Sequence, residues 1–226
     1  MSSRDNQLWL QSWREQRTDF HQQMVNPLLT RFWPGLNLLQ GSRVFVPLCG
    51  KSRDMIWLAR QGHQVIGVEL SPIAVRDFFR ESKLQPVKQK LGAFTLWQDG
   101  RITILCGDYF LLKPEDLGVI DIVYDRAALT ALPEDVRGPY VNQLRRIVAA
   151  TCQIFLLTME DAEEDESLNQ ALGVGEEIKA LYTKDFDIKL MNVDSVYEPN
   201  PESSRLGPIR VEYKVYRLSG RRALCK

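Results

Sequence analysis

The sequence has too few metal-ligating and disulfide-forming residues for either kind of site to define the protein. Its 226 residues include four cysteines, at positions 49, 106, 152 and 225, and only two histidines. No two cysteines are close enough in sequence to form a CxxC pair, so a zinc site with ordinary ligand spacing is excluded and we predict no bound metal. Unpaired thiols are typical of a reducing cytoplasm, where we expect the protein.

A surplus of charge and a long apolar segment are also missing. Lysine plus arginine number 29 and aspartate plus glutamate number 29, so the formal net charge is zero. Proteins that bind nucleic acid, and electrostatic membrane anchors, usually carry a basic excess, so we predict neither partner. The most apolar stretch, residues 147–159, contains three polar residues and is too short to span a bilayer. The polar start of the chain does not have the pattern of a signal peptide.

Glycine-rich phosphate-binding loops are absent as well. Gly50-Lys51-Ser52 is similar to the end of such a loop, but position 45, where the motif needs glycine, is Phe. The dinucleotide pattern GxGxxG is missing because Gly50 stands alone. The loop is therefore less suited to a pyrophosphate, although it can still serve a nucleoside without phosphates. We interpret Lys51 as a solvated lysine and Cys49 as a buried loop residue rather than a nucleophile.

Alternating strands and helices make up most of what is present. Strands are expected at 43–46, 64–69, 119–124 and 153–157, with helices at 52–61, 71–83 and 133–150 between them. Asp99-Gly100 predicts a hairpin between residues 93–97 and 101–105. A helix at 175–182, a strand at 186–193 and a closing antiparallel strand at 210–218 complete the chain. This order favours a mostly parallel sheet covered by helices on both faces.

The first 33 residues are expected to be helical, with breaks at Pro27 and Pro34-Gly35, and to be added to this sheet. Trp9, Trp13, Phe20 and Met24 are spaced by 4, 7 and 4 residues, which places them on one helical face. We therefore predict a single domain over residues 1–226, with residues 1–35 as an N-terminal helical cap.

Ligands of open parallel sheets bind at the carboxyl ends of the strands, and four segments should meet there: 47–52, Glu69, 106–110 and 124–129. Glu69 lies 19 residues after Gly50, close to the spacing expected for an acid that holds ribose hydroxyls. An ionised carboxylate only accepts hydrogen bonds, which suits a pair of hydroxyl donors. The alternative is a strand-end glutamate that caps the next helix.

Three further acidic or basic features allow two interpretations each. Asp108 either lies beside an adenine edge, with Tyr109 or Phe110 against the ring, or is a turn aspartate among core aromatic residues. Arg126 either presents a planar cation at the mouth of the site or pairs with Asp125. The acidic run 160–166 is either a solvated loop or a device that repels anionic substrates.

Four segments together carry a family resemblance. They are Trp9-x3-Trp13-x6-Phe20-His21-Gln22, residues 43–52 (RVFVPLCGKS), residues 62–71 (GHQVIGVELS) and residues 124–129 (YDRAAL). These segments resemble the thiopurine S-methyltransferase family, most closely its bacterial branch. The resemblance covers nearly the whole chain, and PLCGK at a strand end is its most specific part. The family typically has Gly-Pro-Pro-Phe where residues 170–173 of this chain read Gln-Ala-Leu-Gly.

The resemblance implies an α/β, class I (Rossmann-like) methyltransferase that uses S-adenosylmethionine and releases S-adenosylhomocysteine. It implies a mostly parallel seven-stranded sheet with helices on both faces, one antiparallel edge strand and an N-terminal helical lid. Cofactor-binding residues carried over by position are Trp9, Trp13, Leu48, Glu69, Gly107, Asp108 and Arg126. The substrate is expected to contact Phe20, Arg126 and Arg205, with Arg126 in the catalytic role.

The expected reaction is methyl transfer to the sulfur of aromatic or heterocyclic thiols by a monomeric enzyme acting on a small molecule. The main alternative is methylation of selenium or tellurium compounds in metalloid detoxification. A nicotinamide-dependent oxidoreductase is disfavoured by the missing GxGxxG motif. A non-catalytic binding module is disfavoured by the presence of Leu48, Glu69 and Arg126.

Overall fold

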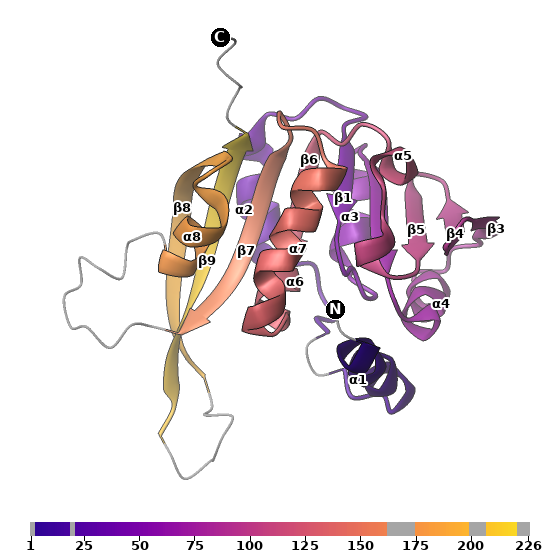
Figure 1. The fold of residues 1–226 in the computed structure, drawn as a ribbon, viewed down its shortest axis with the longest axis horizontal. Helices are drawn as coiled ribbons and strands as arrows, with labels where there is room; N and C mark the ends of the chain where they lie inside the picture. The colour runs from indigo at the N-terminus through magenta and orange to yellow at the C-terminus, as the bar shows by residue number, and fades with distance from the viewer. Residues whose placement is uncertain (1–2, 19–20, 162–174, 199–206, 221–226) are drawn as a thin grey trace. The chain divides into compact units, whose positions relative to one another are not determined.

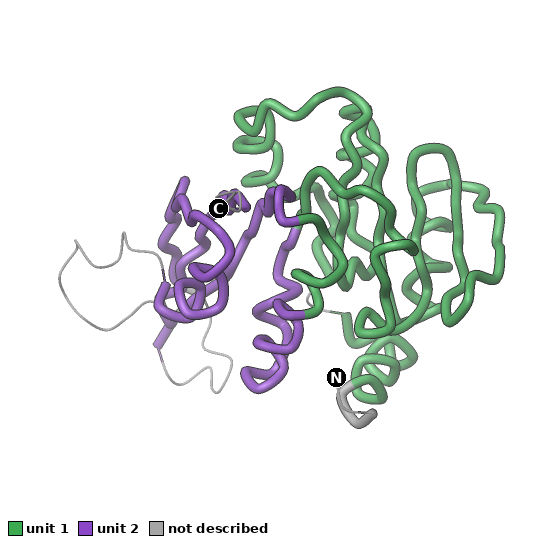
Figure 2. Tube along the Cα trace, turned by 45° about the horizontal axis from the view of Figure 1, so that its top comes forward, with its two compact units in different colours: residues 1–124, 143–149 green, residues 125–142, 150–226 purple. Residues whose placement is uncertain are grey.

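A computed structural model describes residues 3–18, 21–161, 175–198 and 207–220. The chain divides into two compact units, coloured green and purple in Figure 2. Unit 1 comprises residues 1–124 and 143–149, and unit 2 comprises residues 125–142 and 150–226. The chain therefore passes from one unit to the other three times.

Unit 1 is built on strands in the order β3-β4-β5-β2-β1-β6. Its parallel strands are β1 (Arg43–Val46), β2 (Gln64–Glu69), β5 (Ile102–Cys106) and the beginning of β6 (Ile122–Arg126). Two antiparallel strands, β4 (Phe94–Asp99) and β3 (Val87–Leu91), extend the edge beyond β5. Gly100, with a φ of +55°, makes the tight turn of the β4–β5 hairpin that the sequence predicts.

The first helices of unit 1 precede β1, and the later ones follow its strands. They are α1 (Ser3–Arg14), α2 (Pro27–Phe32), η1 (Trp33–Leu36), α3 (Asp54–Arg60), α4 (Pro72–Glu81), η2 (Tyr109–Leu111) and α5 (Pro114–Leu117). Helices α3 and α4 contact β2 and β5. Ser71 caps α4 by accepting a hydrogen bond from the amide of Ala74 at 3.3 Å, and Pro72 occupies the first position, as the sequence predicts.

Unit 2 contains an antiparallel group of strands. These are β7 (Gln153–Asp161), β9 (Ile209–Gly220) and β8 (Phe186–Glu198), with β9 paired to both of the others. Its helices are α6 (Ala128–Ala131), the first part of α7 (Glu134–Ile147) and α8 (Glu176–Tyr182). Ile154, Val215 and Leu218 are fully buried and form part of the core of this unit. The predicted closing antiparallel strand is therefore confirmed as β9.

The predicted strand count and the single antiparallel edge strand are both wrong. Nine strands occur within the described ranges, and four strand pairs are antiparallel. Strand β3 was not predicted, because all five of its residues are exposed and no apolar face produces a recognisable pattern. The result is an α/β fold with a mixed sheet rather than a mostly parallel one.

The N-terminal helix is also shorter than the sequence predicts. It ends at Arg14, and Gln16 has a φ of +56°, which a right-handed helix cannot accommodate. Trp13 is buried, but Met24 is 79% exposed, so the expected four-residue apolar face does not extend that far. A separate helix, α2, begins after Asn26, whose side chain accepts from the amide of Leu28.

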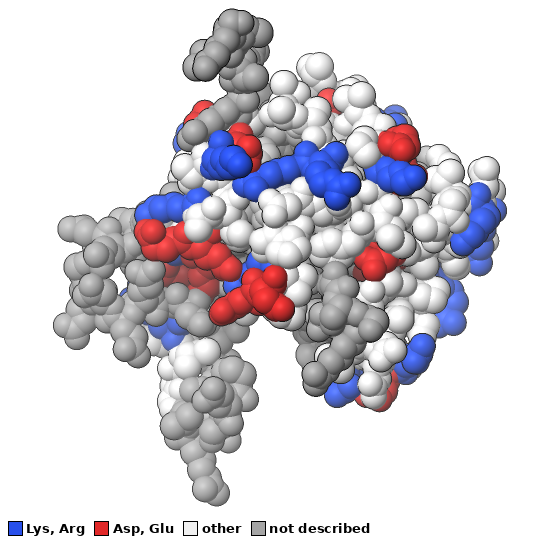
Figure 3. All heavy atoms as spheres, in the orientation of Figure 1, with Lys and Arg blue, Asp and Glu red and all other residues white. Residues whose placement is uncertain are grey.

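Charged side chains of both signs are visible on the face drawn in Figure 3, each sign in small groups. This distribution agrees with equal numbers of acidic and basic residues in the sequence. Within the part of the chain that the structure describes, no helix has the length and apolarity needed to cross a membrane.

Candidate active site

Glu69 lies at the carboxyl end of β2 and joins two neighbouring chain segments. Its Oε2 accepts from the amide of Gly50 at 2.9 Å, and its Oε1 accepts from the amide of Ser71 at 2.7 Å. Burial raises the pKa of this carboxyl group, while the backbone donors at Ser71 and Gly50 oppose the shift. Each carboxylate oxygen has a second lone pair, so Glu69 can still accept from ligand hydroxyls. The helix-capping alternative therefore does not exclude the ribose-binding role.

The loop after β1 is held in an uncommon backbone conformation. Leu48 has a φ of +45° and Gly50 a φ of +52°. A positive φ at a non-glycine residue such as Leu48 is strained, and such strain is frequent at functional sites. A Cβ atom at Gly50 would lie 3.3 Å from the ring of Trp13, so this indole packs directly against the loop. The structure thus brings together three predicted residues, Trp13, Leu48 and Glu69.

The end of β5 adds the other predicted cofactor residues of unit 1. The amide of Gly107 donates to the carbonyl oxygen of Glu69 at 2.9 Å, which fixes this turn beside the end of β2. A Cβ atom at Gly107 would collide with Phe94, so no other residue fits there without a shift. Asp108 follows and caps η2 by accepting from the amide of Phe110. Tyr109 is only 2% exposed, so its ring belongs to the core rather than to a ligand face.

Helix α1 contacts this group of strand ends. Asn6 donates from Nδ2 to Oδ2 of Asp108 at 2.9 Å, while Trp13 lies against Gly50. Figure 1 shows α1 beside α4, at the end of the sheet toward which the arrow of β5 points. Trp9 lies one turn before Trp13 on the same helix and is half-buried. Asn6 is not among the predicted site residues, although its spacing of three and seven residues from the two tryptophans places it on their face.

A buried carboxylate stabilises the end of the PLCGK loop through hydrogen bonds. Asp54, which is 1% exposed, accepts from the amide of Asn26 at 2.8 Å and from the hydroxyl of Tyr124 at 2.8 Å. The amide of Asp54 donates to Oγ of Ser52 at 3.3 Å. Asp54 thereby ties α2, the start of α3 and β6 to the end of the PLCGK loop. Asp54 is not among the residues predicted to contribute to the site.

Arg126 is the last residue of β6 and belongs to unit 2, where it is half-buried. The strand begins and ends later than predicted, because Val119 and Asp121 are exposed and the continuous buried run begins only at Ile122. The neighbouring Asp125 is fully buried and accepts from the hydroxyl of Tyr140 at 2.7 Å and the amide of Leu129 at 3.4 Å. Burial raises the pKa of Asp125 to about 6, against the opposing effect of these donors.

Two predicted substrate residues, Phe20 and Arg205, lie outside the described residues, as do positions 170–173 and 162–166. The part of the acidic run that is described is not a solvated loop. Glu160 belongs to β7, where it pairs with Lys214 at 2.9 Å and accepts from the hydroxyl of Tyr216 at 2.9 Å. Its charge is thus balanced within unit 2. The interpretation of Lys51 as solvated is wrong as well, since its Nζ pairs with Glu81 at 2.9 Å.

The thiols near the site are not activated. Cys49 is 6% exposed, and burial raises its pKa well above the ordinary value, with Glu69 acting in the same direction. Burial, again with a contribution from Glu69, raises the pKa of Cys106 to about 11. A nucleophilic cysteine needs a lowered pKa, so the interpretation of Cys49 as an unreactive loop residue agrees with its surroundings.

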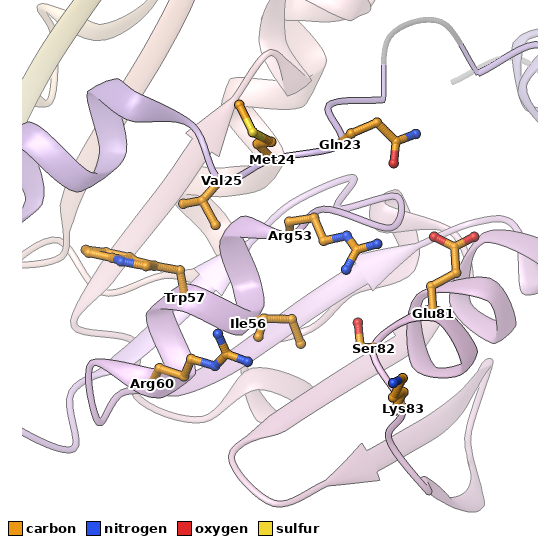
Figure 4. Close-up of a pocket in the computed structure, with 10 residues that line it drawn as sticks. All are labelled: Gln23, Met24, Val25, Arg53, Ile56, Trp57, Arg60, Glu81, Ser82 and Lys83. Carbon is orange, nitrogen blue, oxygen red and sulfur yellow. The ribbon is translucent and has the colours of Figure 1, made fainter.

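An open pocket of about 380 Å³ lies among helices of unit 1 and the segments next to them (Figure 4). Residues from α3, from the end of α4 and from the segment before α2 line it, including Arg53, Trp57, Lys83 and Met24. Among the described residues that line this pocket, none is predicted to bind the cofactor. The candidate site is therefore the group of strand ends, not this pocket.

Solved structures with the same fold define the class of the protein. A SAM-dependent methyltransferase from Anabaena variabilis has a TM-score of 0.61 at 13% identity, covering 96% of this chain and 95% of that chain. A Burkholderia thailandensis 1,6-didemethyltoxoflavin-N1-methyltransferase, solved with bound 1,6-didemethyltoxoflavin and S-adenosylhomocysteine, has a TM-score of 0.58 at 15% identity, covering 95% of this chain and 87% of that one. The fold is that of the class I methyltransferases, as predicted.

Sequence comparison narrows the class to one family. A sequence model of the thiopurine S-methyltransferase family matches residues 4–221. A thiopurine S-methyltransferase of Stutzerimonas stutzeri is 63% identical over 222 residues, covering 98% of this chain and 94% of the relative. One of Nitrosospira multiformis is 42% identical over 215 residues, covering 95% and 98%. The chain belongs to the thiopurine S-methyltransferase family and is an S-adenosylmethionine-dependent methyltransferase, which confirms the predicted family and cofactor.

The residues of unit 1 fit this cofactor. Glu69 has carboxylate lone pairs left for a ribose, and the absence of a glycine-rich loop is no obstacle because the cofactor carries no phosphate. Asp108 and Asn6 offer polar atoms at the neighbouring strand end, and the Oδ1 atom of Asn6 is buried without a partner among the described residues. A nucleoside that brings hydrogen-bond donors matches this set of acceptors.

Proposed function

We propose that the protein methylates the sulfur of aromatic or heterocyclic thiols, as the names of its relatives indicate for thiopurines. The observation that carries the proposal is the hydrogen-bonded group of strand ends around Glu69, together with a helix that carries two tryptophans to its edge. Glu69 is proposed to hold the ribose, with Leu48, Gly107, Asp108, Trp9 and Trp13 around the cofactor.

The protein contributes to such a transfer by aligning the reacting atoms and by excluding water from them. When bound, S-adenosylmethionine supplies a methyl group that the positive charge on its sulfur already activates. Helix α1 is proposed to act as the lid, because its indole rings offer an apolar cover for a flat substrate. Holding the reacting atoms in line within such a cover removes much of the entropic barrier.

We propose Arg126 as the residue that contacts both cofactor and substrate. Its guanidinium is always charged, and a nearby cation lowers the pKa of a thiol and favours the thiolate. Acidic aromatic thiols ionise readily, so the site needs no strong general base. Phe20 and Arg205 are proposed to complete the substrate wall on the strength of the family resemblance alone.

A turnover assay tests the proposal. The purified protein and S-adenosylmethionine are incubated in parallel with a thiopurine, an aryl thiol, selenite and tellurite, and S-adenosylhomocysteine release is measured. Turnover of the thiopurine or the aryl thiol, at least tenfold faster in kcat/KM than with either oxyanion, is the expected result. Faster turnover of selenite or tellurite would instead support the alternative function in metalloid detoxification. If none of the four compounds causes release of S-adenosylhomocysteine, sulfur methylation is refuted.

The remaining expectations stay predictions of the same proposal. We propose a monomeric, cytoplasmic enzyme that acts on small molecules and not on nucleic acid. We also propose that both compact units form one methyltransferase domain over residues 1–226, with residues 1–35 as its cap. Sedimentation of the purified protein tests the monomer, and a mass near twice 26.0 kDa would contradict it.

A further inference from the structure

Helix α1 brings a half-satisfied amide to the end of β5. Nδ2 of Asn6 donates to Oδ2 of Asp108 at 2.9 Å. The other atom of the same amide, Oδ1, is buried and has no hydrogen-bond partner among the residues that the structure describes. A buried acceptor without a donor is costly, and such atoms are rare in folded proteins. Asn6 therefore has one acceptor position that no described residue fills.

The orientation of this amide follows from its neighbour. A carboxylate has no hydrogen to donate, so Asn6 must turn its NH₂ group toward Asp108 and its oxygen away from it. Asp108 is itself held in place, because its Oδ1 accepts from the amide of Phe110 at 2.9 Å. The two side chains thus present neighbouring acceptor oxygens, and each carboxylate oxygen keeps a lone pair that these contacts do not use.

We infer that Asn6 accepts a hydrogen bond from the exocyclic amino group of the adenine, beside Asp108, and so selects for a 6-aminopurine. This inference rests on the proposed function, because it needs the adenosyl group at the strand ends next to Glu69. Gly107 connects the two positions, since its amide donates to the carbonyl of Glu69 and Asp108 follows it directly.

The chemistry of the two oxygens matches an amine and opposes a carbonyl. An exocyclic amino group has two N–H donors and can serve two neighbouring acceptors. A 6-oxopurine would place a third oxygen against them, with no hydrogen between. Asn6 is seven residues before Trp13, two helical turns along the same face, so one helix both packs on the PLCGK loop and contacts the base.

Calorimetric titration of the full chain tests the inference without any turnover. S-adenosylhomocysteine is compared with its 6-oxo analogue, S-inosylhomocysteine, on the native protein and on Asn6→Leu, which keeps the approximate size and favours the helix. Gln7→Leu is the matched control, because Gln7 is the exposed neighbour on the same helix. Thermal unfolding of each variant is recorded alongside.

In the native protein and the control, the adenosyl compound should bind at least tenfold more tightly than the inosyl compound. Asn6→Leu should weaken the adenosyl compound about fivefold, the usual value of one neutral hydrogen bond, and change the inosyl compound less, so that the ratio narrows. Equal losses for both compounds would mean that Asn6 only fastens α1 to Asp108, and this result overturns the inference. If Asn6→Leu leaves the affinities for both compounds, and so their ratio, unchanged, the inference is overturned as well. If the native protein binds neither compound, the proposed function itself fails.

Discussion

Glu69 holds two chain segments together and is also proposed to bind the ligand, and one substitution tests both roles. In Glu69→Gln an NH₂ group replaces one of the oxygens that accept from Gly50 and Ser71. Two donors then face each other, so the free energy of unfolding should fall by about 1–3 kcal/mol. Binding of S-adenosylhomocysteine should weaken about 10- to 100-fold, because hydrogen bonds to charged groups are the stronger ones.

Urea denaturation and calorimetry measure the two effects independently. The matched control is Glu115→Gln, an exposed glutamate that should leave both quantities unchanged. A destabilised protein with native affinity for the ligand would remove Glu69 from the ribose site and leave only its role in the loop.

Arg126 is proposed to act on the acceptor more than on the cofactor, and this distinction is measurable. Arg126→Ala should lower kcat/KM for an anionic aryl thiol about 100-fold, the usual loss when one fixed charge-stabilising donor is removed. The affinity for S-adenosylhomocysteine should fall much less. Arg126→Lys keeps the charge but loses the planar guanidinium, so its kcat/KM should lie between those of the native protein and Arg126→Ala. Equal loss of turnover and affinity would instead make Arg126 a cofactor contact alone.

Asp125 should make the stability of the protein depend on pH. Its pKa is raised from 3.8 to about 6 in the folded protein, so between these values the folded state binds more protons than the unfolded state. Stability from this group is therefore complete below about pH 4 and is lost as the pH rises to about 6. The steepest loss is about 1.4 kcal/mol per pH unit.

Asp125→Asn removes the titration and can keep an acceptor for the amide of Leu129. Urea denaturation at several pH values should show that the stability of the native protein, relative to this variant, declines between pH 4 and 6 and then stays level. Asp135→Asn, at an exposed position, serves as the control and should show no such slope. A constant difference across this range would contradict the raised pKa.

Among the elements, α2, α3 and β6 depend on one buried side chain. Asp54→Ala leaves the amide of Asn26 and the hydroxyl of Tyr124 buried without their acceptor. We expect the free energy of unfolding to fall by about 2–4 kcal/mol, and by about 1 kcal/mol in Tyr124→Phe, which removes only one hydrogen bond. Asp135→Ala should change it by less than about 0.5 kcal/mol. If Asp54→Ala lowers the free energy of unfolding by no more than this control does, its hydrogen bonds do not connect these elements.

Elements with a strong local signal could be predicted from the sequence. Strand β2 has the predicted bounds, because an apolar run between Gly62 and the Ser71-Pro72 helix start leaves little freedom. The β4–β5 hairpin follows from Asp99-Gly100 in the same way. Strand β3 could not be predicted, because its five exposed residues are ordered by pairing with β4 and not by burial.

The positions of two residues proposed to bind the cofactor were predictable for the same local reasons. Glu69 and Gly107 stand directly at the ends of strands that the sequence defines. The spacing of Asn6 from the two tryptophans indicates its helical face, but its contact and that of Asp54 were not predictable, because their partners lie 102 and 70 residues away. The ion pair of Lys51 with Glu81, 30 residues away, was missed for this reason too.

At the scale of the whole molecule, unit 1 is not a contiguous piece of chain. Gln143, in its second segment, donates from Nε2 to the carbonyls of Tyr109 and Leu112. A fragment of residues 1–124 lacks this donor and Leu144 and Ile147, which are almost fully buried. We expect the fragment to lack a cooperative thermal transition by circular dichroism, whereas the full chain has one. A cooperative transition in the fragment would show that unit 1 folds without residues 143–149.

Strand β3 affects how well the protein resists aggregation with other copies of itself. It is the first strand in the order, so one of its edges has no strand beside it among the described residues. Such an edge is a template for aggregation unless charge protects it. Lys88 and Lys90 lie on this strand, and Lys88 is held 3.7 Å above the ring of Trp97. Neutralising both lysines would leave a bare β-edge flanked by exposed Val87 and Leu91, open to fibril-like stacking of one molecule on the next.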